Sequence, residues 1–417
     1  MRCKGKMIRR MSSEKIFLGL VTFLWGYHAF FRYFGIVLKR IPSIGFIFLS
    51  LIVSFLIIGS IPYISKCVRS KDLLLGFLAI IVVLVTLLVN AKTTEPFNEI
   101  WPEFLLQCFV MYYVGLALHK KLHIDNGLLN ILSIVSILSI LILTIVFNNT
   151  NGGFEYEWSS NQYIPYSLLP HILLLMADIF KKMSIIKLLV VLYGFFNLVM
   201  LGNRGSIVCF LVMFLLLTIY KTISMNVKKR VLLLLGIGVF IFIATFTNLY
   251  DIALKGLYQY ALDHNLSTRV FQTFLGEYTA GTSFDSGRLD IQKVLWQRLA
   301  QYPFGYGLGS DRYFVEQYAH SIILELLINF GIIIGGIILI IVLVKIVSGL
   351  RIVSEDSCVR SIYLISFCMG FVKLFISGSY LTEPYFYLLL GLSVSLIRTK
   401  KSNLQQRGKI IRLERDL

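Results

Sequence analysis

The stretch that decides the fold class is AHSIILELLINFGIIIGGIILIIVLV, residues 319–344. After a short polar start it contains one acidic side chain, Glu325, in an otherwise almost unbroken apolar run. A transmembrane helix needs about 20 predominantly apolar residues to cross the hydrocarbon core of a bilayer. We therefore predict that this segment spans a membrane as a helix.

The same apolar character extends along the whole chain. Of its 417 residues, 57% are hydrophobic and only 15% are charged, and the mean hydropathy is +0.78. Soluble globular chains have about 45–50% apolar and about 25% charged residues. The composition excludes a disordered chain, a collagen-like chain, a disulfide miniprotein and a soluble enzyme. It predicts an all-α polytopic integral membrane protein.

Apolar runs between polar breaks predict about twelve transmembrane helices. Nine lie within residues 1–248 and three within residues 319–397, which a basic tail at residues 398–417 follows. The one long loop is at residues 249–318, a length that is uncommon without a function. The twelve runs cover residues 16–38, 44–61, 73–90, 100–118, 127–147, 163–180, 184–201, 205–220, 231–248, 319–344, 359–377 and 384–397.

Basic residues are distributed unequally between the two sides of this layout. With the N-terminus inside, 28 of the 40 Lys and Arg residues fall in inside segments and five in the short outside loops. Cytoplasmic loops of membrane proteins carry the excess of Lys and Arg. Both termini are therefore predicted to be cytoplasmic, and residues 249–318 extracytoplasmic.

The net charge of +18 follows from the same asymmetry. The inside segments carry +20 and the outside segments −2, while Lys373 and Glu325 cancel within the spans. Clustered cytoplasmic cations attract anionic lipid. The expected partner of the basic tails is thus membrane lipid, and no nucleic acid is expected.

The long loop has a nearly balanced set of charges and seven tyrosines between Tyr258 and Tyr318. Such a surface suits carbohydrate, because sugar hydroxyls need both donors and acceptors. A solvated cap with structural tyrosines is the equally weighted alternative.

Within the loop, residues 286–288, Ser-Gly-Arg, open a helical stretch that ends before Pro303. Asp285 or Ser286 can cap this helix. Arg288 falls in its first turn, where free N–H groups and the helix dipole favour an anion, so the guanidinium could grip a diphosphate. The alternative is a surface Arg paired with Asp285 or Glu277. An apolar stripe on the helix could lie on the membrane surface; it consists of Ile291, Val294, Leu295 and Leu299.

The segment Gly305-Tyr306-Gly307-Leu308-Gly309 follows this helix. Alternating glycines allow unusual backbone conformations and close approach to a ligand. A plain turn is the simpler interpretation. Neither a P-loop nor a dinucleotide-binding loop is predicted, because no Lys-Ser/Thr follows and no strand precedes.

The tenth predicted span begins with titratable side chains. His320 stands at the outer boundary, where a neutral imidazole can take a proton near pH 7. Glu316 would share its face and orient the ring if the helix begins that early. Glu325 lies inside the span, where a carboxylate costs about 2.5–3.5 kcal/mol and usually faces a cavity or a partner. For His320 the alternative is an interfacial histidine satisfied by the loop.

Two more cations are predicted near the outer face. Arg204 occupies the tight turn between the seventh and eighth spans, against the positive-inside trend, and its flanking glycines leave room for a lipid headgroup. Lys373, near the outer end of the eleventh span, would either snorkel outward or add a third cation to the same pocket.

Together these motifs resemble the bacterial O-antigen ligase and Wzy-type polysaccharide polymerase family. Arg204 matches the family's outer-turn Arg, Arg288 its S-G-R Arg, and residues 303–309 its P-x-G-x-G-x-G turn. His320 and Glu325 match its H-N-x-x-L-E pattern.

The matching stretch covers residues 202–336, and the twelve-span layout extends the likeness over the whole chain. One departure is Ser321, which stands where the family usually has Asn. This departure weakens any role assigned to that amide.

The resemblance implies a GT-C-like glycosyltransferase of the bacterial cytoplasmic membrane, active on the outer face without a metal or cofactor. It would polymerise repeat units linked to undecaprenyl diphosphate into O-antigen or capsular polysaccharide, with inversion. Its partners would be these lipid-linked glycans, a chain-length regulator and a flippase. The expected catalytic residues are Arg204, Arg288 and His320, and the expected substrate-binding residues are Glu316, Glu325, Lys373, Tyr306, Gly307 and Gly309.

Two alternatives remain open at this point. A ligase of the same fold would move finished glycan to an acceptor such as lipid A core or a wall polymer. A secondary transporter or lipid-oligosaccharide flippase would be expected to have midplane charges and internal two-fold symmetry, whereas this chain gathers its titratable residues at one outer loop.

Overall fold

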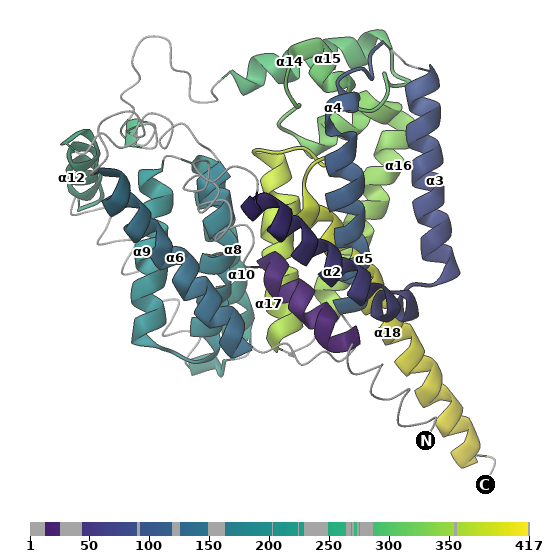
Figure 1. Ribbon diagram of the computed structural model, residues 1–417, viewed down its shortest axis with the longest axis horizontal. Coiled ribbons are helices and arrows are strands. Elements are labelled where there is room, and N and C mark those ends of the chain that lie inside the picture. The colour runs from purple at the N-terminus through teal and green to yellow at the C-terminus, as the bar shows by residue number, and fades with distance from the viewer. Residues whose placement is uncertain are drawn as a thin grey trace. The chain divides into compact units, whose positions relative to one another are not determined.

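The computed structural model describes residues 13–25, 44–89, 92–118, 126–148, 163–201, 203–223, 225–228, 249–263, 268, 271–272, 275, 287–353 and 357–415. Every regular element in these ranges is a helix (Figure 1). The predicted class, a helical membrane protein, is therefore confirmed. The GT-C-like fold and the division of the chain at residues 249, 319 and 398 stay predictions.

Six helices within the described ranges are long and apolar enough to cross a membrane: Ser70–Leu88, Phe97–Leu118, Ile164–Lys181, Arg204–Ile223, Ile322–Ile352 and Cys358–Phe375. Each coincides with a predicted span. The ninth predicted span, residues 231–248, lies outside the described residues, as does the first beyond residue 25. The number twelve therefore stays a prediction.

The chain forms two compact units. Unit 1 contains Met1–Trp25, Leu38–Asp125 and Gly287–Leu417, and unit 2 contains Gly26–Val37 and Asn126–Ser286. Each unit is described by itself.

Unit 2 is built around α8 (Tyr163–Lys181), whose residues from 164 to 177 are buried. It packs against α6 (Asn126–Asn148), α9 (Ile185–Met200) and α10 (Arg204–Ile223). At one end of α8, Asp178 pairs with Lys187 and accepts a hydrogen bond from Asn130 Nδ2 at 2.9 Å. A fifth helix, α12 (Leu249–Asp263), contributes Ala261 to a small core with Met200 and Phe271.

Unit 1 contains the remaining described elements. Its centre is the packing of α18 (Pro384–Arg415) against α5 (Val110–Leu118) and α16 (Ile322–Ile352). Near the start of α3, the Asp72 carboxylate accepts two hydrogen bonds from the Arg398 guanidinium of α18. The other elements are α2 (Ile44–Cys67), α3 (Ser70–Val89), α4 (Phe97–Glu103), η1 (Phe104–Phe109), α14 (Arg288–Gln301), α15 (Ser310–Val315), α17 (Ser357–Phe367), η2 (Cys368–Val372) and η3 (Lys373–Phe375).

The apolar helix α16 is broken. Gly331 has φ 80° and ψ 169°, so α16 consists of an inner arm (residues 322–330) and a spanning arm (residues 332–352). A Cβ on Gly335 would lie 2.6 Å from the carbonyl oxygen of Leu326, whereas nine residues of a straight helix extend about 13 Å. The two arms are therefore folded against each other.

The lengths and burial of the arms agree with this division. The 21 residues of the spanning arm extend about 31 Å, which matches a hydrocarbon core of about 30 Å. Most of its isoleucines are exposed, with Ile333 71% accessible, whereas most of the inner arm is buried. The apolar run predicts a helix over residues 319–344 but not its break, because Gly331 permits a backbone conformation that local hydrophobicity does not encode.

Candidate functional site

The glycine-rich turn of the long loop packs onto the break in α16. The backbone N–H groups of Tyr306 and Gly307 donate to the carbonyl oxygens of Ile328 and Asn329 at 2.8 and 3.0 Å. In return, the N–H of Ile332 donates to the Pro303 carbonyl at 2.9 Å. A broken helix leaves backbone groups without intrahelical partners, and buried ones must be satisfied elsewhere. The turn satisfies them.

This packing explains two of the glycines directly. Gly305 has φ 90°, and a Cβ there would lie 2.3 Å from the backbone nitrogen of Gly331. A Cβ on Gly331 would lie 2.5 Å from the carbonyl of Phe304. The turn thus has a structural task, and substrate binding by Tyr306, Gly307 and Gly309 stays a prediction.

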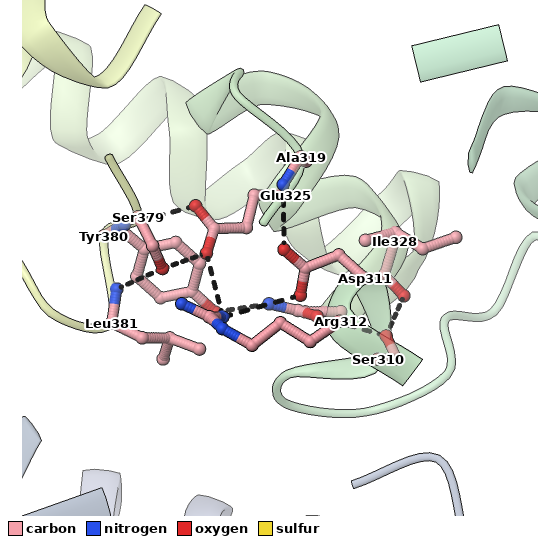
Figure 2. Close-up of polar contacts among 10 residues, drawn as sticks. Ser310, Asp311, Arg312, Ala319, Glu325, Ile328, Ser379, Tyr380 and Leu381 are labelled. Atoms are coloured by element: carbon pink, nitrogen blue, oxygen red, sulfur yellow. Dashed lines mark hydrogen bonds and ion pairs between the residues drawn. The ribbon is translucent and has the colours of Figure 1, made fainter. Parts of the chain in front are cut away.

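A buried cluster of charges lies beside the turn, in unit 1 (Figure 2). Arg312 Nη1 is 3.8 Å from Asp311 Oδ1 and 3.8 Å from Glu325 Oε1. Both acidic residues are fully buried. Among the described residues, Arg312 is the one cation within 4.0 Å of either carboxylate, so one guanidinium faces two acids.

Hydrogen bonds hold Glu325 on its other side. Its carboxylate accepts from the Ser379 hydroxyl and from the Tyr380 N–H, the latter at 3.1 Å (Figure 2). The Tyr380 hydroxyl accepts from Asn329 Nδ2 at 2.9 Å, and Asn329 Oδ1 accepts from the Ser310 hydroxyl at 3.1 Å. The cluster therefore joins α15, the inner arm of α16 and the segment after η3.

The sequence points to Glu325 but not to the residues that surround it. Asp311 and Arg312 stand out there only as two of the charges of the long loop. One signal was available, because a carboxylate inside a span requires a partner, and Arg312 follows the glycine turn directly. No local pattern identified Ser379 or Tyr380.

His320 lies between α15 and α16 in a left-handed conformation, with φ 54°. The preceding backbone is fixed by Asp311, whose Oδ2 accepts the N–H of Ala319 at 3.0 Å. The Tyr318 ring lies 4.2 Å from the imidazole, centroid to centroid. The Nδ1 atom of His320 is buried, and no described group hydrogen-bonds to it.

The electrostatic surroundings keep this histidine neutral. The pKa of His320 is lowered to about 4, first by burial and then by the positive charge of Arg288, while a hydrogen bond with the backbone of Ile376 acts in the opposite direction. At Asp311, burial raises the pKa, although the Arg312 charge and the bound N–H groups favour the carboxylate. A neutral imidazole with a free nitrogen lone pair can accept a proton.

Arg288 is brought toward His320 by the packing of α14. It lies on the same face of that helix as Leu295 and Leu299, which form a buried core with Ala319, beside His320, and with Leu324 and Ile328. The predicted helix is confirmed as α14, Arg288–Gln301. Its N-cap is Gly287, while Asp285, Ser286 and the suggested partner Glu277 lie outside the described residues.

The structure places two other predicted residues differently from the expectation. Glu316 does not share a helix face with His320, because α15 ends at Val315 and α16 begins only at Ile322; its side chain is exposed. Lys373 donates to the Glu383 carboxylate, and its side chain is mostly buried in that pair. Two roles were expected for Lys373, snorkelling outward or adding a third cation to the pocket. Neither of them included this ion pair with Glu383.

Arg204 is the first residue of α10, in unit 2. Asn203 caps the helix, since its side-chain oxygen accepts the N–H of Ser206 at 3.0 Å. Because Arg204 and His320 belong to different units, their joint action stays a prediction.

Comparison with known proteins does not assign the chain to a family. No family model matches it, and no curated protein is significantly similar to it. Among the described residues, no three His, Cys, Asp or Glu side chains form a group that could hold a metal ion.

Proposed function

We propose that this protein is a membrane glycosyltransferase that polymerises oligosaccharide repeat units linked to undecaprenyl diphosphate. The observation that carries the proposal is the electrostatic influence of Arg288 on His320, together with the packing of α14 against Ala319 and the start of α16, which brings two segments of the chain together. One is a cation at a helix N-terminus and the other a neutral imidazole with an unpartnered, buried nitrogen. These are the two groups that transfer from a diphosphate requires.

The proposed reaction is a single displacement. The acceptor hydroxyl oxygen attacks the anomeric carbon of the donor sugar while the bond from that carbon to the diphosphate oxygen breaks. His320 takes the hydroxyl proton, and Arg288 stabilises the negative charge that develops on the departing diphosphate. Attack from the side opposite the leaving group inverts the anomeric configuration.

Substrate binding would raise the pKa of His320 toward the value that a general base needs. The pKa of His320 in the free protein, about 4, makes it a weak base at pH 7. A diphosphate bound at Arg288 offsets that positive charge, and an adjacent negative charge raises the pKa of a histidine. The anion thus moves His320 toward the range in which general bases are most effective.

Transport is the rival function, and the break in α16 favours it. Secondary transporters bind their substrates at discontinuous helices of this kind. In this protein, the freed carbonyls of Ile328 and Asn329 accept hydrogen bonds from the glycine turn. Glu325 is occupied by Ser379, Tyr380 and Arg312. The broken helix therefore offers few ligands to an ion or solute, which favours the transferase.

The decisive test is chain extension by the purified protein in vesicles that contain undecaprenyl-diphosphate-linked oligosaccharide. We expect the wild type to form a ladder of longer lipid-linked glycans. The His320→Gln variant should lose about 10²–10⁴-fold in rate, as for removal of a general base. Arg288→Ala should lose about 10²–10³-fold, as for loss of one stabilising donor.

The matched control is Arg298→Ala, an exposed Arg of the same helix that lies over the Phe314 ring instead of near His320. It should extend chains at the wild-type rate. Full activity of either site variant would contradict the assigned roles. If the wild type transfers finished glycan only to another acceptor, the ligase alternative replaces polymerisation, and solute uptake without transfer would support transport.

A further inference from the structure

Helix α14 has two apolar faces, and the structure accounts for only one of them. Leu295 and Leu299 are buried against the start of α16. On a neighbouring face, Leu289, Lys293, Trp296 and Ala300 follow one another at helical spacing, and all four are exposed. Leu289 is 66% accessible. Of the stripe predicted to lie on the membrane, Leu295 and Leu299 are thus packed inside the protein while Val294 is exposed, and a different apolar face is exposed as well.

The exposed face continues into the membrane-spanning part of the molecule. Phe304, 73% accessible, follows α14 and lies 5.7 Å from the Tyr302 ring, centroid to centroid. Next to it, Pro303 accepts the N–H of Ile332, the first residue of the spanning arm. Exposed isoleucines at 332, 333 and 334 extend the apolar surface from there.

The hydrogen bond between Ile332 and Pro303 also fixes the depth of α14. The spanning arm is just long enough to cross the hydrocarbon core, so Ile332 lies at one edge of that core. Arg351, in the last turn, marks the other end of the arm. Figure 1 shows α14 and α15 at one end of unit 1 and the C-terminal part of α18 at the opposite end.

We infer that the exposed face of α14, with Phe304, lies in the interface of the lipid bilayer, at the membrane edge where the spanning arm of α16 begins. The occupant of this surface is lipid. Trp and Tyr favour the headgroup level, and Lys beside Trp and Leu is typical of helices that lie in the plane of the interface. Lys293 places a positive charge where lipid phosphates are found.

The test uses the full-length protein in phosphatidylethanolamine–phosphatidylglycerol vesicles, with nitroxide labels on α14. Ala300→Cys places a label on the inferred lipid face, and Gln301→Cys is the matched control on the polar side of the helix, because it lies neither three nor four residues from any residue of the inferred lipid face. Both positions are exposed, so neither label disturbs the core. Cys3 and Cys67 are replaced by Ser to prevent labelling elsewhere, and size-exclusion profiles confirm folding.

We expect the label at position 300 to collide more with oxygen, which partitions into lipid, than with a water-soluble nickel chelate. The label at position 301 should show the opposite ratio. Equal access of the chelate to both labels would overturn the inference. Protection of position 300 from both reagents would overturn it as well, because protein would then cover this face.

This inference does not depend on the proposed function, since the labels report their surroundings without turnover. If both hold, Arg288 lies at headgroup depth, where a lipid-linked diphosphate is reached without leaving the bilayer. A lipid-facing α14 in a protein without transferase activity would contradict the proposed function alone.

Discussion

At the scale of single residues, Arg312 determines whether two buried acids are tolerated. Asp311 and Glu325 approach it from α15 and from the inner arm of α16, each at 3.8 Å. Breaking a buried ion pair by removing one partner leaves an uncompensated charge. The consequence differs according to which partner is removed.

We predict that Arg312→Met destabilises the protein by about 3–5 kcal/mol, the usual cost of a buried unpaired charge. Glu325→Gln should cost less, because the amide oxygen still accepts hydrogen bonds from Ser379 or Tyr380 and Arg312 keeps Asp311 as its partner. Thermal unfolding in detergent measures both, with the exposed Arg298→Met as control. Equal midpoints for Arg312→Met and Arg298→Met would show that the cluster does not stabilise the fold.

His320 gives a pH-dependent prediction. An unfolded histidine binds a proton near pH 6.5, whereas the pKa of His320 in the folded protein is about 4. Between these values the unfolded state binds more protons, so stability falls as the pH falls. The wild type should therefore lose more stability from pH 6.5 to 4 than His320→Gln, and the two should run parallel above pH 6.5.

Inorganic pyrophosphate extends this test to the anion site without requiring activity. Bound near Arg288, it should raise the pKa of His320 and reduce the difference between wild type and His320→Gln in that window. The effect should disappear in Arg288→Ala. If, without pyrophosphate, the stabilities of the wild type and of His320→Gln also ran parallel between pH 6.5 and 4, a neutral, buried His320 would be contradicted.

At the scale of elements, alanine substitutions at two adjacent glycines test whether the two arms of α16 are folded against each other. A Cβ on Gly335 would lie 2.6 Å from the Leu326 carbonyl, whereas no described atom lies within 4 Å of a Cβ on Gly336. Gly335→Ala should therefore destabilise by about 1–3 kcal/mol through overpacking. Gly336→Ala should stabilise by about 0.5–1 kcal/mol, as for alanine in a helix interior.

The measurement is chemical unfolding of the two variants beside the wild type. Because the two sites are neighbours with the same residue type, helix propensity alone predicts the same gain for both. Opposite signs would support two packed arms. Equal stabilisation would indicate a straight helix through residue 331.

At the scale of the whole molecule, orientation is the property to test. Charge asymmetry predicts both termini inside and residues 249–318 outside. In unit 1, Asp72 pairs with Arg398, and both residues were assigned to the inside. We predict that an impermeant maleimide labels Gln317→Cys in intact cells, and Ser402→Cys only after permeabilisation, in a background with Ser at 3 and 67.

Both substituted positions are exposed, so access to the reagent depends on the side of the membrane. Labelling of Ser402→Cys in intact cells would reverse the orientation. It would also remove the proposed site from the outer face, since Gln317 lies three residues before His320.

Much of the fold was predictable because it depends on local composition. Apolar runs located every membrane-spanning helix that the structure describes, and the Ser-Gly-Arg motif located α14. The site was predictable only in part. Residue type and position singled out His320 and Arg288 as candidates, whereas the condition for Glu316 to share the face of His320 is not met, because the two helix ends between them have no strong local signal.

The sequence by itself determined that this is a helical membrane protein with an asymmetric charge distribution, since membrane insertion depends on the length and hydrophobicity of each segment. Only the tertiary structure decided that α16 folds back at Gly331, that Arg312 is the partner of Glu325, and that Arg288 lies toward His320. These three features depend on contacts between segments that are separate along the chain. No periodicity within one segment encodes such contacts, because they form only when the packed elements satisfy one another's polar groups.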